Sequence, residues 1–156
     1  RDTAVGAFLV QQLNLFALSA ARVGCKRNPM PPALRGAYCA PYDTPSNRIA
    51  TLRFVQDIPL KEGDSGYDLV SDIEAGLQRF ANLPMTICWG LKDFVFDRHF
   101  LKEWQRRFPN AEVHAFDDCG HYILEDASDE VIPIIEQFLA ANPLDPPAAA
   151  APDEKA

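Results

Sequence analysis

The sequence lacks an unbroken apolar stretch of eighteen residues, which argues against a membrane-spanning helix. It also lacks the closely paired cysteines that are typical of zinc and redox sites, so Cys25, Cys39, Cys88 and Cys119 are expected to be reduced thiols. Its N-terminus lacks the charged start and the small-residue cleavage site of a signal peptide. We therefore expect a soluble protein of the cytoplasm.

Positive charge is scarce in the sequence. The 15 lysines and arginines are outnumbered by 22 acidic residues, which gives a formal net charge of -7. Such a surface repels the phosphates of nucleic acids and of anionic membranes, so small molecules or proteins are the expected partners. The length of 156 residues and the 47% hydrophobic content fit one globular domain.

The N-terminal segment is predicted to be one amphipathic helix. Apolar side chains recur at spacings of three and four over residues 3–21. Asp2 or Thr3 is the expected N-cap, and Gly24 is the expected stop signal.

A proline-rich connection and a second helical region follow. The prolines between residues 24 and 47 preclude a long regular element, although "PPALRGAYC" allows two helical turns that begin at Pro32. The segment "TPSNRIATLRFVQ" predicts a helix capped by Thr44, with Pro45 at its first position. This helix should end before Pro59, because the residue before a proline disfavours helical geometry.

The second half of the sequence alternates between helical and strand patterns. A helix capped by Asp64 or Ser65 is followed by the short apolar run "MTICW", which suits a strand of a parallel sheet. Asp97 then caps a helix that is expected to bury Phe100, and "AEVHAF" forms a second strand. A last helix is predicted over residues 128–141.

These elements predict the α/β class with a right-handed βαβ unit. Pro133 should kink or shorten the last helix. Two parallel strands do not make a stable sheet by themselves, so we expect further strands outside this chain.

An acidic residue and a histidine follow the two predicted strands. Asp93 lies four residues after "MTICW", and His121 lies five residues after "VHAF". The carboxyl ends of parallel strands meet at one edge of a sheet, so the two side chains should be neighbours. A carboxylate that holds one imidazole nitrogen leaves the other nitrogen to act as a general base. The alternative is that Asp93 is a turn residue and that His121 begins a helix.

Other polar residues nearby have simpler interpretations. Asp97 is predicted to be a helix N-cap, and His99 and His114 are predicted to lie on the surface. A metal site built from Asp93, Asp97, His99 and His121 lacks a recognised ligand spacing. We therefore predict neither a metal nor a cofactor.

Two long segments carry a specific resemblance. "LPMTICWGLKDFVFD" and "RRFPNAEVHAFDDCGHYILEDASDEVIPIIEQFL" resemble the C-terminal half of α/β-hydrolase-fold enzymes of the haloalkane dehalogenase-like branch. In that family the triad acid lies in a W-G-x-x-D motif and the triad histidine in a G-H-[YF]-x-x-E motif. The first motif is matched by Trp89, Gly90 and Asp93, and the second by Gly120, His121, Tyr122 and Glu125. The resemblance thus implies catalytic roles for Asp93 and His121.

The resemblance also implies a division of the chain. Residues 1–62 are similar to the helical cap region of such enzymes, and residues 63–141 are similar to the C-terminal part of the hydrolase core. The expected fold is therefore a partial α/β-hydrolase fold, with the cap region, the last two parallel strands and their flanking helices. Residues 142–156 are rich in proline and alanine and are expected to be disordered.

Within this branch, "YCAPYDTPSNRIATLRFVQDIPL" and "DFVFDRHFLKEWQRRFP" most resemble the β-lactone decarboxylases of bacterial long-chain olefin biosynthesis. This implies an aspartate nucleophile, a long-chain β-lactone substrate, and carbon dioxide and a cis-alkene as products. A thiolase-like and a ligase-like enzyme are the implied partners. Apolar side chains of the first helix either line an alkyl-binding cavity or pack in the core; they are Phe8, Leu9, Leu13 and Phe16.

The sequence departs from the family in one respect. The nucleophile motif G-x-[SDC]-x-G is absent, because "VGCKR" and "GDSGY" match neither its pattern nor its preceding strand. We expect the nucleophile, which is Asp, Ser or Cys, in an N-terminal half that precedes Arg1, and we expect the chain alone to be inactive. The alternatives are a fragment of an esterase-like or lipase-like serine hydrolase and a non-catalytic interaction module.

Overall fold

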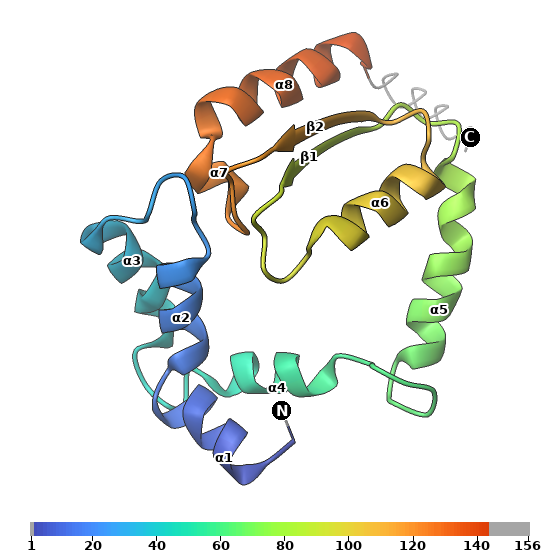
Figure 1. Ribbon diagram of the computed structural model, residues 1–156. Coiled ribbons are helices and arrows are strands. Elements are labelled where there is room, and N and C mark those ends of the chain that lie inside the picture. Colours follow the sequence, from blue (N-terminus) through green and yellow to red (C-terminus); the bar gives the residue numbers. More distant parts are fainter. Residues whose placement is uncertain (1, 144–156) are drawn as a thin grey trace, which may run out of the picture.

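The computed structural model describes residues 2–143, which contain a two-stranded parallel sheet with its helices and a group of helices at the N-terminal end (Figure 1). Of the segment 142–156, which was predicted to be disordered, residues 144–156 lie outside the described residues. The elements are, in order, α1 (Ala4–Ala7), the π-helix η1 (Phe8–Gln12), α2 (Leu15–Val23), α3 (Pro32–Cys39), η2 (Ala40–Tyr42), α4 (Ile49–Asp57), α5 (Tyr67–Gly76), η3 (Leu77–Phe80), β1 (Thr86–Gly90), α6 (Arg98–Arg107), β2 (Glu112–Phe116), α7 (Ile123–Asp126) and α8 (Ser128–Ala141).

The sheet confirms the predicted βαβ unit. Strands β1 and β2 pair in parallel, from Thr86 opposite Glu112 to Gly90 opposite Phe116, and α6 connects them. In Figure 1, α8 lies on one side of the two strands and α6 on the other. As predicted, Asp97 caps α6, because its carboxylate accepts a 2.8 Å hydrogen bond from the backbone N–H of His99.

The core of this region lies between the sheet and the C-terminal helices. The buried side chains Phe116, Cys119, Ala127 and Val131 form one cluster, and Cys88 of β1 packs against it. Helix α8 has the predicted bounds, 128–141, so Pro133, which was expected to kink or shorten it, does not shorten it. The short helix α7, which precedes α8, was not predicted.

The prediction of one helix over residues 3–21 is wrong. The helix breaks at Asn14, which has a left-handed backbone conformation with φ of 53°, and the segments Ala4–Gln12 and Leu15–Val23 are bent by 68° relative to each other. Asparagine tolerates this conformation better than most residues. Here its side chain also donates a 3.1 Å hydrogen bond to the carbonyl of Tyr42. The predicted end near Gly24 is confirmed.

Arg48 stabilises this break from a distant part of the chain. Its guanidinium donates hydrogen bonds to the carbonyls of Gln11 (3.0 Å) and Gln12 (2.8 Å), and only 9% of the residue is exposed. A helix that stops leaves its last carbonyls without partners, and Arg48 supplies partners for two of them. Within residues 2–143 no single helix is long and apolar enough to cross a membrane, and the bent pair meets that test only when its two parts are joined.

Helix α4 begins later than predicted. Thr44 accepts a 3.3 Å hydrogen bond from the N–H of Asn47, so it caps a turn, and the helix itself starts at Ile49. The predicted end before Pro59 is confirmed, as is the start of α3 at Pro32.

Helix α5 connects the N-terminal helices with the sheet (Figure 1). Its N-cap is Gly66, with φ of 81°, and not Asp64 or Ser65 as predicted. The apolar side chains of α5 are largely exposed, including Leu69 at 63%. Phe100 on α6 is also exposed, which corrects its predicted burial. A substantial apolar surface thus lies open beside the sheet.

Candidate active site

Backbone hydrogen bonds join the loops that follow the two strands. The N–H of Leu91 donates to the carbonyl of Phe116, and the N–H of Lys92 donates to the carbonyl of Cys119, both at 2.9 Å. The pairing of the strands therefore continues beyond their ends, and it holds the loop of Asp93 beside the loop of His121.

Three glycines allow the backbones of this region to approach closely. A Cβ added to Gly90 would meet the carbonyl oxygen of Gly120 at less than 3.0 Å, and one added to Gly120 would meet the carbonyl oxygen of Gly24 equally closely. A Cβ on Gly24 would overlap the ring of Tyr122. The Tyr122 N–H also donates a 3.2 Å hydrogen bond to the carbonyl of Gly24. Any larger residue at these glycines would separate the loops.

The carboxylate of Asp93 is held at both of its oxygens. Oδ1 accepts hydrogen bonds from the N–H groups of Val95 (2.7 Å) and Phe96 (3.0 Å). Oδ2 lies 2.9 Å from Nδ1 of His121. Only 10% of the Asp93 side chain is exposed. The two amides orient the carboxylate, so its second oxygen points to the imidazole.

This contact determines the tautomer of His121. An ionised carboxylate only accepts hydrogen bonds, so Nδ1 must carry the proton, and Nε2 of a neutral ring then has a free lone pair. The histidine side chain is 29% exposed. Three aromatic rings surround the imidazole, with centroids 5.4 Å (Tyr122), 5.8 Å (Phe96) and 6.2 Å (Phe94) away. A small cavity of about 180 Å³ opens beside this pair. With its ring held by Asp93, His121 can accept a proton at Nε2.

Similarity to known proteins identifies the surrounding fold. No protein-family model matches the chain. Two curated relatives are named cis-3-alkyl-4-alkyloxetan-2-one decarboxylase: one from Shewanella oneidensis is 59% identical over 139 residues, and one from Xanthomonas campestris is 45% identical over 144 residues. The alignments cover 89% and 92% of this chain but 44% and 48% of the relatives. The chain therefore spans about half the length of the curated relatives it matches.

Similarity to solved structures identifies the fold. A putative ancestral haloalkane dehalogenase, AncHLD2, has a TM-score of 0.80 at 21% identity, over 90% of this chain and 49% of that one. The dehalogenase DatA from Agrobacterium tumefaciens has a TM-score of 0.71 at 21% identity, over 90% and 48%. The chain has the C-terminal half of an α/β-hydrolase fold. The predicted partial fold and the resemblance to β-lactone decarboxylases are confirmed.

In this half hydrolase fold, the other candidate residues lie apart from the Asp93–His121 pair. His99 is at the surface as predicted, with its side chain 88% exposed and Nδ1 3.2 Å from the Asp97 carboxylate. Among residues 2–143, no three His, Cys, Asp or Glu side chains are grouped so as to hold a metal ion.

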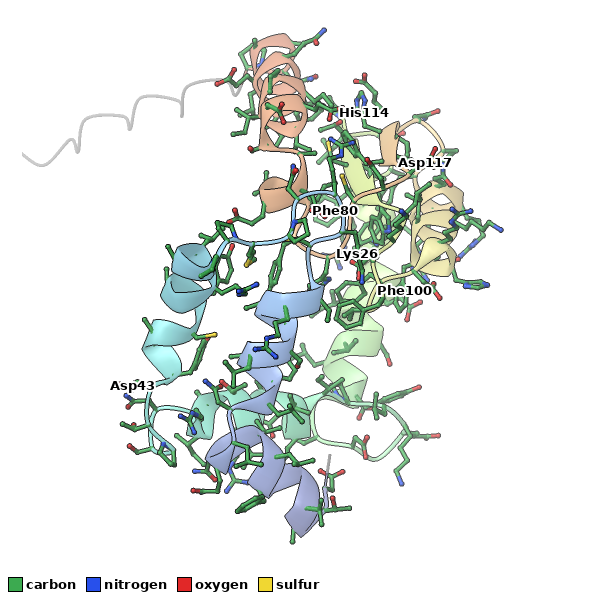
Figure 2. All side chains as sticks on the ribbon, turned by 60° about the vertical axis from the view of Figure 1, so that its left-hand side comes forward. Lys26, Asp43, Phe80, Phe100, His114 and Asp117 are labelled. Carbon is green, nitrogen blue, oxygen red and sulfur yellow. The ribbon has the colours of Figure 1, made fainter. Side chains whose placement is uncertain are left out.

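His114 lies only partly at the surface where it was predicted, because 27% of its side chain is exposed. Its Nε2 is buried, and the carboxylate of Glu112 lies 3.1 Å away without the angles of a hydrogen bond. Figure 2 shows His114 on the part of the hydrolase fold that contains the sheet, whereas Asp43 lies at the opposite end, among the N-terminal helices.

The sequence did not point to two further contacts of the hydrolase fold. Tyr38 of α3 donates a 2.7 Å hydrogen bond to Glu125, and this bond raises the pKa of the tyrosine to about 12. Asp126, at the end of α7, is completely buried. Three of its four backbone N–H partners, Lys26, Arg27 and Asn28, lie 98 to 100 residues earlier, which no local spacing reveals.

Proposed function

We propose that this chain supplies the base and the acid of an α/β-hydrolase-fold enzyme that decarboxylates a β-lactone with two alkyl substituents. The 2.9 Å contact between Asp93 and His121 is the observation that carries the proposal. The curated relative that is 59% identical, itself named a decarboxylase of cis-3-alkyl-4-alkyloxetan-2-one, supports this reaction over dehalogenation. The dehalogenase structures, at about 21% identity, support the fold alone.

In this proposal His121 acts through Nε2. It accepts a proton from a water or from the substrate, and Asp93 stabilises the imidazolium that forms. Loss of carbon dioxide from the lactone breaks the ring bonds C2–C3 and C4–O and makes the C3–C4 double bond. This overall reaction neither consumes water nor releases a proton. Any proton that His121 takes up must therefore be returned before the products leave.

The nucleophile is proposed to come from polypeptide outside these 156 residues. The motif G-x-[SDC]-x-G is absent from the sequence, and covalent catalysis in this fold needs it. The exposed apolar surface supports such a second half. A groove of about 450 Å³ between α5 and α6, with Ile73, Phe100 and Trp104 among its lining residues, is available for the rest of the hydrolase core to cover. The chain alone is then inactive.

Two apolar cavities among the N-terminal helices support a hydrophobic substrate. One of about 340 Å³ is lined by Leu9, Phe16 and Leu52, among others, and one of about 260 Å³ is lined by Phe16 and Tyr122, among others. Ligand sites are typically apolar hollows of this kind. Of the four side chains expected to form an alkyl cavity, Leu9 and Phe16 line one, although Phe16 is 44% exposed, whereas Phe8 and Leu13 are 53% exposed and line neither of these two cavities.

Several finer points belong to the same proposal. The cap boundary at residue 62, a long-chain substrate, a cytoplasmic location and an assembly with thiolase-like and ligase-like enzymes all rest on the resemblance. No specific observation favours the serine-hydrolase or interaction-module alternatives, and the reported relatives are named decarboxylases and dehalogenases.

Replacement of His121 tests the function. In the complete enzyme that contains this chain, His121→Ala should lower turnover of a cis-dialkyl β-lactone by about three powers of ten or more, as removal of comparable bases does. The measurement is alkene formation by gas chromatography. The matched control is His99→Ala, whose side chain is 88% exposed and should be dispensable.

Two outcomes would contradict the proposal. Wild-type turnover by His121→Ala would remove the histidine from the mechanism. Formation of a hydroxy acid that carries oxygen from ¹⁸O-labelled water, in place of alkene and carbon dioxide, would replace decarboxylation with hydrolysis.

A further inference from the structure

We propose that Asp126 is a positioning residue that holds the loop of His121 against both the sheet and the first connecting loop. The inference rests on the proposed role of His121 as the base. Asp126 lies five residues after His121, at the end of α7, and its exposed fraction is 0%.

Four backbone N–H groups from two distant segments surround the Asp126 carboxylate. Oδ1 accepts from Lys26 (3.0 Å), Arg27 (3.0 Å) and Asn28 (2.9 Å), and Oδ2 accepts from Lys26 (2.9 Å) and Gly120 (2.7 Å). Burial of a carboxylate is costly unless hydrogen bonds replace its water. Here four amides do so, and charge-assisted bonds of this kind are stronger than neutral ones.

One oxygen acts directly on the histidine loop. The N–H of Gly120 precedes His121 by one residue, and its 2.7 Å bond to Oδ2 closes the segment 120–126 on itself. The start of this segment is thereby fixed, and with it the direction from which the imidazole meets Asp93. Misplacement of a catalytic group by about 1 Å can lower the rate about 100-fold, so this constraint matters for chemistry.

The other oxygen holds the segment 26–28, which follows α2. Figure 2 shows Lys26 in the loop between α2 and α3, at the end of the N-terminal helices that faces the sheet. The same segment is joined to the histidine region by the Arg27 side chain, which donates to Asp118 at 2.8 Å and also pairs with Glu130. The Asp126 carboxylate thus couples the position of the N-terminal helices to the orientation of His121.

An asparagine at position 126 cannot reproduce this arrangement. Its amide places an NH₂ group where aspartate has its second carboxylate oxygen, and NH₂ donates hydrogen bonds but does not accept them. In one orientation this group faces the N–H of Gly120, and in the other it faces the N–H groups of Arg27 and Asn28, while Lys26, which bonds both oxygens, keeps one acceptor in each. Either way, one side of the coupling loses an acceptor, while the size of the side chain is unchanged.

The test compares Asp126→Asn with Asp117→Asn in the complete enzyme. Asp117 lies on the loop between β2 and α7 that contains His121, and its side chain is exposed (Figure 2). In Asp126→Asn, the low-field NMR signal of the proton between His121 and Asp93 should be lost, and kcat should fall by about 10- to 100-fold while KM changes by less than about threefold. Asp117→Asn should retain both. A folded Asp126→Asn variant that keeps the signal and wild-type kcat would overturn the inference.

A second measurement needs no variant, and it decides the matter if Asp126→Asn does not fold. In the unchanged protein, the amide protons of residues 26–28 and Gly120 should exchange with solvent at a common, slow opening rate, because one carboxylate holds them. Exchange of Gly120 as fast as that of exposed loop amides would overturn the inference. Failure of the proposed function would appear as wild-type turnover in His121→Ala. The NMR signal and the amide exchange rates test the role of Asp126 separately, because neither measurement depends on enzyme activity.

Discussion

The loops around His121 and the apolar face of α5 are built in opposite ways. The loops are joined by backbone hydrogen bonds, by glycine contacts and by a carboxylate that is fully buried. On α5, by contrast, Leu69, Val70 and Ile73 are each at least half exposed. The proposed base and its proposed acid are therefore held in place within this chain, whereas the apolar face of α5 is suited to a partner surface that would complete the core.

This difference separates two requirements of the proposed enzyme. Orientation of an imidazole needs directional contacts at short range, and the segments that supply them here lie within one chain. Burial of apolar area needs only a complementary surface, which a different part of the fold can supply. Three changes test whether the two regions differ as described.

The largest effect is expected for Gly120→Ala. Its Cβ would lie under 3.0 Å from the carbonyl oxygen of Gly24, and that atom belongs to backbone that cannot rotate away. The loss in free energy of unfolding should exceed about 3 kcal/mol, the upper end of ordinary overpacking. Urea denaturation followed by circular dichroism measures it.

Gly36→Ala in α3 is the matched control, because a Cβ there meets nothing within 4 Å. That change should stabilise the protein by up to about 1 kcal/mol, since alanine favours helix over glycine. Equal effects of the two substitutions would show that the close backbone approach at Gly120 is not needed.

The second comparison uses two leucines. Leu101 of α6 is 6% exposed and Leu69 of α5 is 63% exposed. Leu101→Ala should cost about 3 kcal/mol of the free energy of unfolding, because it leaves a cavity. Leu69→Ala should cost less than about 0.5 kcal/mol in this chain alone.

The same leucines report on the proposed second half of the fold. If further polypeptide covers α5, the cost of Leu69→Ala should rise to about 2 kcal/mol when that half is present, and the cost of Leu101→Ala should stay the same. A small cost for Leu69→Ala under both conditions would indicate that α5 remains open to solvent.

The smallest effect per side chain is a loss of stability at alkaline pH. Burial is the main cause that raises the pKa values of the Cys25 and Cys119 thiols from the ordinary 9.0 to about 11. The fold thus favours the neutral thiols. Their contribution is complete below pH 9.0, where both states are protonated, and it is lost as the pH rises toward 11, because the unfolded chain ionises first.

The expected loss is on the order of 2 kcal/mol for each thiol, measured by urea denaturation across that pH range. Cys119→Ala should make the decline shallower. A free energy of unfolding that is constant from pH 9 to pH 11 would contradict the burial of these thiols.

Local patterns in the sequence determined the unit β1–α6–β2, the cap at Asp97 and the pairing of Asp93 with His121. Apolar runs, an N-cap and the geometry of parallel strands are short-range signals, and the carboxyl ends of two paired strands must lie together. The parallel pairing of the two strands alone places the loops that follow them side by side, and it brings their side chains together.

Only the tertiary structure decided the break at Asn14 and the role of Asp126. The break depends on Tyr42 and Arg48, which lie 28 and 34 residues further along the chain, and the Asp126 carboxylate binds amides of the segment 26–28. These contacts join residues whose separation in the sequence follows no helical or strand period. Local propensity is a weak guide at such positions, because the free energy comes from partners that meet only after the chain has folded.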